Sequence, residues 1–280
     1  MDDEHDDRVY HPYVRYDSNV CILMTKTIDF SKYSSIKIGP IRDVLILDTI
    51  MPLPHGYRLI GGANNLLVSP TPPPLAILDK CFDFIRLEGD VLHVGGATPS
   101  GKILSFAKKH HLAGFELMQK LPGTLGGMVA MNAGLKEWEV FNHLIAIQTE
   151  EGWIRKDAIE HGYRFAKIKG VVYEATFTCK EGFDENLLAM FKKMRDNQPQ
   201  LPSAGSCFKN PLGHHAGKLI EDVGLRGKRI GNMSFSEQHA NFLVNLGNGT
   251  YEDALALISL AKEEVCNRFG ITLEEEIILL

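Results

Sequence analysis

The sequence predicts an α+β protein built from two domains, for three reasons. The chain has 280 residues, which at about 100–200 residues per domain is enough for two. Before residue 184, short strand patterns separated by glycine and proline turns dominate. From Asp184 onward, amphipathic helices alternate with strands. We therefore expect a strand-rich first domain followed by a smaller α+β domain.

The composition excludes several classes of protein. Apolar residues make up 44% and charged residues 23% of the chain, as in most globular proteins, and the net charge of -5 leaves no broad basic surface for nucleic acid. The five cysteines include no C-x-x-C pair, so neither a disulfide framework nor a zinc ribbon is expected. No apolar run reaches the ~20 residues that cross a bilayer, and the N-terminus is acidic. We expect a cytoplasmic protein with no bound metal and no membrane segment.

The predicted elements begin after an acidic N-terminal stretch. Residues 1–23 open with dense charge and little apolar surface, so they are predicted to be a disordered extension. The pattern then predicts strands at 44–50 and 57–60, and a hairpin in which 84–87 pairs with 91–94. This half is also predicted to contain helices at 100–112, ended by Gly114, and 128–133, and strands at 143–149, 153–155 and 171–179.

In the second half the helix signals are stronger. Thr250, three residues before Asp253, is typical of an N-cap, and apolar positions then recur at helical spacing up to Gly270. The other predicted helices are 185–197 and 216–223, the latter closed by Gly224, and the predicted strands are 230–235, 241–246 and 271–280. The last strand is expected to be buried, with the Glu276 carboxylate at its edge.

Three loops contain the residue types that bind anions. Glycine-rich loops at 61–66 and 121–127 leave backbone N–H groups free to approach phosphate oxygens. The loop 205–211 brings together the hydroxyl of Ser206, the ammonium of Lys209 and the carboxamide of Asn210, which suits a polar, anionic ligand. The run 213–218 is not a P-loop, because its glycines are too closely spaced and Leu219 follows the lysine. We therefore expect a cofactor and a substrate, both bound locally through phosphate.

The motifs together are more specific than any one of them. In chain order they are 61–67 (GGANNLL), 121–127 (LPGTLGG), 131–134 (MNAG), 162–164 (GYR), 205–211 (GSCFKNP), 239–242 (HANF) and 273–276 (LEEE). This ordered set resembles the UDP-N-acetylenolpyruvoylglucosamine reductase (MurB) family of peptidoglycan synthesis. The resemblance extends from about residue 27 to residue 280.

The resemblance implies a fold, two cofactors and a substrate. It implies an FAD-binding domain of the vanillyl-alcohol-oxidase (PCMH) type over 24–184, a substrate-binding domain over 185–270, and a C-terminal strand over 271–280. FAD, reduced by NADPH, would reduce UDP-N-acetylglucosamine enolpyruvate to UDP-N-acetylmuramate. The short spacing between Arg164 and the 205–211 loop resembles the subtype that lacks an inserted tyrosine loop, and we expect a monomer.

The resemblance also implies a role for particular residues. Arg164 would hold the substrate carboxylate, Ser206 would donate a proton, and Glu276 would stabilise the enol form of the substrate. The cofactor-binding residues would be Gly61, Gly62, Asn64, Asn65, Leu66, Gly123, Thr124, Gly126, Gly127, Asn132 and Gly134. The substrate-binding residues would be Tyr163, Lys209, Asn210, Arg226 and His239.

Simpler interpretations exist for each of these residues taken alone. A serine after a glycine is often a turn residue, Arg164 and Arg226 are the type found in exposed ion pairs, and His239 is as easily a buried core residue. At the level of function, the alternatives are another flavin oxidoreductase of the same fold and a catalytically silent binding protein. Two positions depart from the family pattern: Ala166 stands where serine is usual, and 61–65 reads GGANN where GGGSN is usual.

Overall fold

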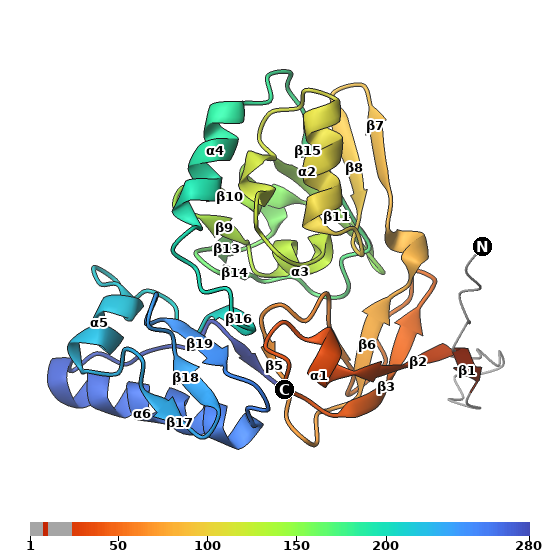
Figure 1. Cartoon of the computed structure of the whole chain (residues 1–280). Coiled ribbons are helices and arrows are strands. Elements are labelled where there is room, and N and C mark those ends of the chain that lie inside the picture. The colour runs from red at the N-terminus through yellow and green to blue at the C-terminus, as the bar shows by residue number, and fades with distance from the viewer. Residues whose placement is uncertain (1–7, 11–23) are drawn as a thin grey trace, which may run out of the picture. The chain divides into compact units, whose positions relative to one another are not determined.

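The computed structural model describes residues 8–10 and 24–280 (Figure 1). These residues divide into two compact units: the first contains 8–10, 24–28, 42–62 and 73–192, and the second contains 29–41, 63–72 and 193–280. The predicted disordered extension lies outside the described residues except for β1 (Arg8–Tyr10), which pairs antiparallel with β2 (Met24–Asp29). The division falls within the first glycine loop, between Gly62 and Ala63.

A mixed sheet opens the first unit. Its strand order in the described part of the chain is β1-β2-β3-β6-β4, and β6 pairs in parallel with both β3 and β4. The further strands are β3 (Ile41–Leu47), β4 (Arg58–Leu59) and β6 (Leu75–Leu78). Leu45, Leu47 and Ala76 pack with Val171 and Tyr173 in a buried cluster. The strands predicted at 44–50 and 57–60 are confirmed, although the first begins and ends earlier than predicted.

An antiparallel sheet of order β12-β11-β15-β8-β7 forms the rest of this unit's framework. Its strands are β7 (Ile85–Glu88), β8 (Val91–Gly95), β11 (Leu144–Thr149), β12 (Gly152–Arg155) and β15 (Glu174–Thr178). Glu88 is opposite Val91, so Gly89 and Asp90 form a two-residue turn, and the predicted hairpin is confirmed. Two small hairpins accompany this sheet: β9 (Gly134–Leu135) with β10 (Trp138–Glu139), and β13 (His161–Gly162) with β14 (Phe165–Ala166).

The helices α2 (Ser100–Lys109) and α3 (Leu125–Ala130) end before the predicted limits of 112 and 133. Each is closed by a non-glycine residue in the left-handed region: His111 has φ 53° and Asn132 has φ 43°. The next N–H then bonds back across the last turn, from Leu112 to the Ala107 carbonyl (2.9 Å) and from Ala133 to the Met128 carbonyl (2.8 Å). These are Schellman closures. The prediction placed the end of the first helix too late because it expected Gly114 to close it. The remaining helical segments of this unit are α4 (Glu185–Met194), η1 (Lys80–Phe82), η2 (Glu116–Met118), η3 (Val140–Asn142) and η4 (Lys156–Ala158).

The second unit is an antiparallel sheet of order β16-β19-β18-β17 with the long helix α6 packed against β17 and β18 (Figure 1). Its elements are α1 (Phe30–Tyr33), β5 (Leu66–Leu67), β16 (Ser203–Ser206), α5 (Ala216–Asp222), β17 (Arg229–Ile230), β18 (Met233–Phe235), β19 (Phe242–Asn245), α6 (Tyr251–Phe269) and β20 (Ile278–Leu279). The strand predicted at 230–235 is instead a tight hairpin, because Gly231 turns the chain with φ 52°.

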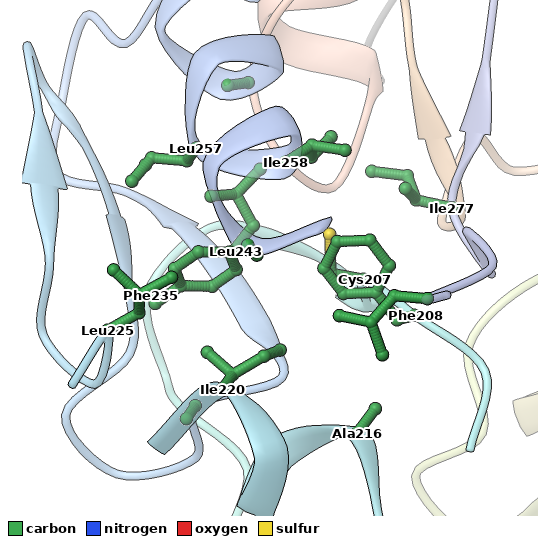
Figure 2. Packing of buried hydrophobic residues seen from close by; sticks show 14 of the residues in the cluster. Cys207, Phe208, Ala216, Ile220, Leu225, Phe235, Leu243, Leu257, Ile258 and Ile277 are labelled. Atoms are coloured by element: carbon green, nitrogen blue, oxygen red, sulfur yellow. The ribbon is translucent and has the colours of Figure 1, made fainter. Parts of the chain in front are cut away.

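Helix α6 confirms the capping prediction at both ends. The Thr250 hydroxyl accepts a hydrogen bond from the Asp253 N–H at 3.1 Å, and Gly270 closes the helix with φ 68°. The buried face of α6 includes Leu257 and Ile258, which belong to one apolar cluster with Leu243 of β19 (Figure 2). The core of this unit is therefore a helix-on-sheet layer.

The predicted C-terminal strand is much shorter than 271–280. Only Ile278 and Leu279 form a strand, β20, which pairs in parallel with β5. Before it, the Glu276 N–H bonds to the Cys207 carbonyl (2.9 Å), whereas the Ile278 N–H bonds to the Asn65 carbonyl (2.9 Å). The Ile277 N–H also bonds to the Cys207 carbonyl (3.3 Å), so the chain changes its pairing partner between Ile277 and Ile278, which interrupts a regular strand. The expected burial holds for Leu273 and Ile277, which are 1% and 4% exposed, but not for Ile278 and Leu279 of β20, which are 42% and 38% exposed.

Candidate active site

The predicted site residues are distributed over both units. The first unit contains Gly61, Gly62, Gly123, Thr124, Gly126, Gly127, Asn132, Gly134, Tyr163 and Arg164. The second contains Asn64, Asn65, Leu66, Ser206, Lys209, Asn210, Arg226, His239 and Glu276.

The two glycine loops of the first unit lie against each other. A Cβ atom on Gly61 would stand 2.5 Å from the Thr124 hydroxyl oxygen, so a side chain at this position would clash. A Cβ on Gly126 would stand 3.2 Å from the Gly96 carbonyl oxygen. A Cβ on Gly127, by contrast, would meet no atom closer than the Thr124 hydroxyl oxygen at 3.8 Å. The contact with Thr124 therefore excludes a side chain at position 61, whereas no neighbouring atom excludes one at position 127.

Asn132 is completely buried and its amide is engaged on every side. Its Nδ2 donates to Glu139 Oε2 (2.7 Å) and to the Gly162 carbonyl (3.0 Å), and its Oδ1 accepts from the Phe141 N–H (3.3 Å). These bonds tie the end of α3 to the β13–β14 hairpin. Asn132 therefore fixes this part of the fold, and a direct contact with a cofactor stays a prediction.

Arg164 occupies a strained backbone position. Gly162 is opposite Phe165, so Tyr163 and Arg164 form the two-residue turn of a hairpin, and Arg164 has φ 61°. Glycine or asparagine is favoured there, because a larger side chain costs about 1–2 kcal/mol in the left-handed region. The guanidinium donates to the Gly134 carbonyl (2.9 Å) and lies over the Tyr163 ring, 5.1 Å from its centre. The guanidinium is thus held by its own hairpin and by the Gly134 carbonyl of β9, and a contact with the substrate stays a prediction.

In the second unit, the loop that contains Ser206 is paired with the segment that contains Glu276. Ser206 is opposite Phe242 at the end of the β16–β19 ladder, and Gly205 before it has φ 81°. The Cys207 carbonyl accepts from the Glu276 N–H at 2.9 Å and from the Ile277 N–H at 3.3 Å. One peptide unit therefore separates the residue that carries the hydroxyl from the backbone that positions the Glu276 carboxylate.

The side chains of Cys207 and Phe208 anchor this loop in the apolar core. Both are buried in the cluster that also contains Ile277 (Figure 2). Burial raises the pKa of the Cys207 thiol, and the nearby charges of Glu275 and Glu276 raise it further. Cys207 therefore stays a neutral thiol and serves as a packing residue beside Ser206.

Asn64, Asn65 and Leu66 lie close to the same C-terminal segment. Asn65 Nδ2 donates to the Glu276 carbonyl at 2.8 Å, and Asn64 Nδ2 donates to the Ser35 hydroxyl at 2.5 Å. Leu66 is buried in β5, opposite Ile278 of β20. Asn65, in the first glycine loop, is therefore hydrogen-bonded to Glu276, although the two residues are 211 positions apart in the sequence.

Lys209 and Asn210 already have protein partners. The Lys209 ammonium forms an ion pair with the Glu274 carboxylate, and the Lys209 N–H donates to the Glu274 carbonyl at 2.9 Å. Asn210 Oδ1 accepts from the N–H of Ala216, the first residue of α5, at 3.0 Å. The loop is thus ordered by its own polar side chains.

Arg226 and His239 are close enough to interact electrostatically. Arg226 donates to Glu221 Oε2 (2.7 Å) and to the Glu237 carbonyl (2.8 Å). Burial lowers the pKa of His239, and the positive charge of Arg226 lowers it further, in spite of a backbone hydrogen bond that acts in the opposite direction. The His239 Nδ1 accepts from the Asn241 N–H at 3.3 Å, so the neutral ring carries its proton on Nε2.

Within the described residues, no three His, Cys, Asp or Glu side chains converge on a point suited to a metal ion. In the same part of the chain, every helix is too short or too polar to cross a bilayer.

Comparison with known proteins covers nearly the whole chain. The family model for the C-terminal domain of UDP-N-acetylenolpyruvoylglucosamine reductase matches residues 197–280. The reductase of Helicobacter hepaticus is 48% identical over 262 residues, covering 92% of this chain and 100% of the relative. That of Campylobacter jejuni is 46% identical, covering 90% and 99%. The chain belongs to the UDP-N-acetylenolpyruvoylglucosamine reductase family.

A solved structure supports the fold of this reductase family member. The crystal structure of UDP-N-acetylenolpyruvylglucosamine reductase (MurB) from Thermus caldophilus superposes with a TM-score of 0.80 at 28% identity. The match covers 92% of this chain and 99% of that one. The predicted α+β class and the predicted family are therefore confirmed.

Two residues that hold predicted site residues in place were not themselves predicted. Glu139 accepts from Asn132, and Ser35 accepts from Asn64. Neither lies in a recognisable motif: Ser35 is in the turn after α1, and Glu139 lies in a two-residue strand. Only the tertiary structure brings them to the residues they hold, so the sequence carries no local signal for them.

Proposed function

We propose that the chain is an NADPH-dependent flavoenzyme that reduces UDP-N-acetylglucosamine enolpyruvate to UDP-N-acetylmuramate. The observation that carries the proposal is the hydrogen bond between the Cys207 carbonyl and the Glu276 N–H, because it ties a hydroxyl loop to a half-buried carboxylate. Family membership over almost the full length of several reductases supports the same reaction. A proton donor and a charge-stabilising group in one unit are what the second half of this reaction needs.

The backbone of the glycine loops is the proposed holder of FAD, in a domain of the vanillyl-alcohol-oxidase type. At the start of α3, the N–H groups of Leu125 and Gly126 bond to the carbonyls of Thr98 and Gly96 (both 2.9 Å). Among the described residues, none accepts from the Gly127 N–H. A Cβ on Gly127 would meet only the Thr124 hydroxyl oxygen, at 3.8 Å, and together with the N–H group this fits a pyrophosphate oxygen. Gly61, Gly62, Gly123 and Thr124 would complete the cradle.

When bound, FAD would accept a hydride from NADPH and deliver it to the enolpyruvyl carbon β to the carboxylate. Negative charge then spreads from the α carbon of the substrate into its carboxylate. Arg164, planar and permanently charged, holds that carboxylate through two hydrogen bonds. Glu276 stabilises the enol form, and Ser206 donates its proton to the α carbon. A hydroxyl serves as the acid here because the acceptor carbon is strongly basic.

The remaining polar residues are assigned to the nucleotide sugar. Tyr163 and Arg226 would contact the diphosphate, and Lys209, Asn210 and His239 would contact other polar groups of the substrate. Lys209 and Arg226 now pair with carboxylates, so a substrate phosphate would take the place of Glu274 and Glu221. We assign the protein to the subtype without the inserted tyrosine loop, and to the cytoplasm, where nucleotide sugars are made. We expect it to act as a monomer.

Cofactor content tests the proposal. The protein should copurify with noncovalent FAD, and acid treatment should release a flavin with the absorbance and chromatographic mobility of FAD. A colourless protein that also fails to bind added FAD would contradict the proposal. Turnover of the flavin-loaded protein without NADPH would favour another flavin oxidoreductase, and binding of flavin or nucleotide sugar without any turnover would favour a silent binding protein.

A further inference from the structure

We propose that Asn241 is a positioning residue for this reaction, which sets the locations of both Ser206 and Glu276. The inference rests on the proposed function, because it takes those two residues as the proton donor and the charge-stabilising carboxylate. The Asn241 amide bonds to neither the hydroxyl nor the carboxylate. It acts through the backbone of Cys207 and Phe208.

The Asn241 side chain makes two hydrogen bonds to the backbone of one residue, Phe208. The Asn241 side chain is buried, with the residue only 4% exposed. The Nδ2 donates to the Phe208 carbonyl (2.8 Å), and the Oδ1 accepts from the Phe208 N–H (3.0 Å). The Asn241 backbone carbonyl also accepts from the Cys207 N–H (2.7 Å). The side-chain amide thus donates and accepts the two hydrogen bonds that the backbone of a neighbouring strand would otherwise make.

These side-chain hydrogen bonds are needed because the regular pairing of β16 with β19 ends at Ser206. The last pair between β16 and β19 joins Ser206 to Phe242, and the register of the ladder is irregular just before it. Residues after Ser206 run beyond the ladder, where buried N–H and C=O groups without partners would each cost about 1–3 kcal/mol. The Asn241 amide supplies those partners and so extends the pairing by one residue.

The opposite edge of the same segment holds the C-terminal carboxylates. The Cys207 carbonyl accepts from the Glu276 N–H, Phe208 forms a β-bridge with Glu275, and the Lys209 N–H donates to the Glu274 carbonyl (2.9 Å). Residues 207–209 therefore lie between Asn241 on one side and 274–276 on the other. A shift of Phe208 would move Ser206 and Glu276 together, and a misplacement of about 1 Å at a reacting group can slow a reaction by about 10²-fold.

Asn245 provides a matched control on the same strand, β19. It is 3% exposed, its Nδ2 donates to the Ile36 carbonyl (2.9 Å), and its Oδ1 accepts from the N–H groups of Gly247 and Gly249 (both 2.9 Å). Its burial and hydrogen bonding match those of Asn241, but its partners do not belong to the Ser206 loop. Any general cost of losing a buried amide should appear equally in both variants.

The test compares Asn241→Leu with Asn245→Leu in the full-length flavin-loaded protein. Stopped-flow spectroscopy follows flavin reduction by NADPH and flavin reoxidation by UDP-N-acetylglucosamine enolpyruvate separately. For Asn241→Leu we expect reduction within about 2-fold of the wild type and reoxidation slowed by about 10–100-fold. For Asn245→Leu we expect both rates within about 3-fold of the wild type, because its partners lie outside the site. Hydrogen exchange, measured on the protein without flavin as well, should become faster at the Cys207 and Phe208 amides only in Asn241→Leu.

Several outcomes would overturn the inference: unchanged reoxidation in Asn241→Leu, equal slowing in both variants, or unchanged exchange at Cys207 and Phe208. Should Asn241→Leu fail to fold, Asn241→Asp keeps the size and the acceptor and is measured in the same way. Ser206→Ala separates this inference from the function on which it depends. Slow reoxidation in Ser206→Ala with normal reoxidation in Asn241→Leu contradicts the positioning role alone, whereas normal reoxidation in Ser206→Ala contradicts the proposed function.

Discussion

Among single residues, Glu276 and Glu274 show most clearly how position decides the role of a side chain. Both are near the chain end, yet the structure distinguishes them. Glu276 is half-buried, and its backbone bonds to Cys207 and Asn65. The Glu274 side chain is 71% exposed and pairs with Lys209. The sequence places both carboxylates on one strand face but sets only Glu276 beside the apolar run 277–280, and in the structure Glu276 is the more buried of the two.

We therefore predict that Glu276→Gln loses about 10²–10³-fold in turnover, because a group that stabilises developing charge is removed. Glu274→Gln should stay within about 3-fold of the wild type, since exposed ion pairs contribute about 0–1 kcal/mol. Steady-state assays with UDP-N-acetylglucosamine enolpyruvate, together with flavin content, check both. A larger loss in Glu274→Gln than in Glu276→Gln would contradict the assignment.

Arg164 allows function to be separated from stability. Arg164→Gly removes the guanidinium but also the left-handed strain, so we expect the melting temperature to change by less than about 3 °C while turnover falls by more than about 10²-fold. Lys136 is a matched control, because it also has positive φ (55°) and lies in the two-residue turn of the β9–β10 hairpin. Lys136→Gly should leave turnover unchanged. Loss of activity that follows a large loss of stability in Arg164→Gly would contradict the carboxylate-binding role proposed for Arg164.

At the scale of elements, local chemistry predicted some boundaries and missed others. Thr250 and Gly270 bound α6 as predicted, because both caps act within one turn of the helix. The ends of α2 and α3 were missed, because His111 and Asn132 take the left-handed position that glycine usually fills. The C-terminal strand was overextended, because its pairing switches from Cys207 to Asn65, and no local pattern records such a switch.

In the candidate site, too, local features are visible in the sequence and tertiary contacts are not. The motifs that contain Ser206, Arg164 and Glu276 are visible in sequence because each is local. Asn65 and Asn241 also lie in motifs, but their supporting roles are not visible in sequence, because Asn65 reaches Glu276 and Asn241 reaches Phe208 only after the second unit has folded.

Helix α3 gives a prediction at this scale. Gly127→Ala should stabilise the protein without flavin by about 0.5–1 kcal/mol, since alanine is the better helix former and its Cβ would meet no atom closer than 3.8 Å. It should nevertheless weaken FAD binding by at least about 10-fold, because the methyl group enters the space proposed for the pyrophosphate. Chemical denaturation and FAD titration measure the two effects.

Gly101→Ala is the control for this helix prediction. Gly101 is the second residue of α2, and a Cβ there meets no atom within 4 Å. It should give a similar gain in stability with unchanged FAD affinity. Equal FAD affinity in Gly127→Ala and the wild type would contradict the proposed cradle.

At the scale of the whole molecule, stability should depend on pH through histidines in both units. Burial lowers the pKa of His143, and the charges of Lys156 and Lys180 lower it further, although Glu116 acts in the opposite direction; the pKa of His239 is also lowered. The unfolded chain then binds more protons as the pH falls. The stability contributed by the neutral rings is complete above the unfolded pKa of about 6.5 and is lost progressively as the pH falls from there through the lowered pKa of the folded state.

We therefore predict that the melting temperature falls between about pH 7.5 and about pH 5.5, on either side of the unfolded pKa, and that His143→Gln reduces the size of this fall. Thermal unfolding of both proteins across this range, at constant ionic strength, provides the measurement. Parallel curves for the variant and the wild type would show that His143 does not contribute to the pH dependence.

As a whole, the proposed enzyme carries electrons from NADPH to an enolpyruvyl nucleotide sugar through bound FAD. An anaerobic titration of the flavin-loaded protein, first with NADPH and then with UDP-N-acetylglucosamine enolpyruvate, tests this transfer directly. We predict that NADPH bleaches the flavin absorbance, that the substrate restores it, and that one UDP-N-acetylmuramate forms per flavin reoxidised. Flavin that NADPH reduces but the substrate cannot reoxidise would contradict the proposed transfer.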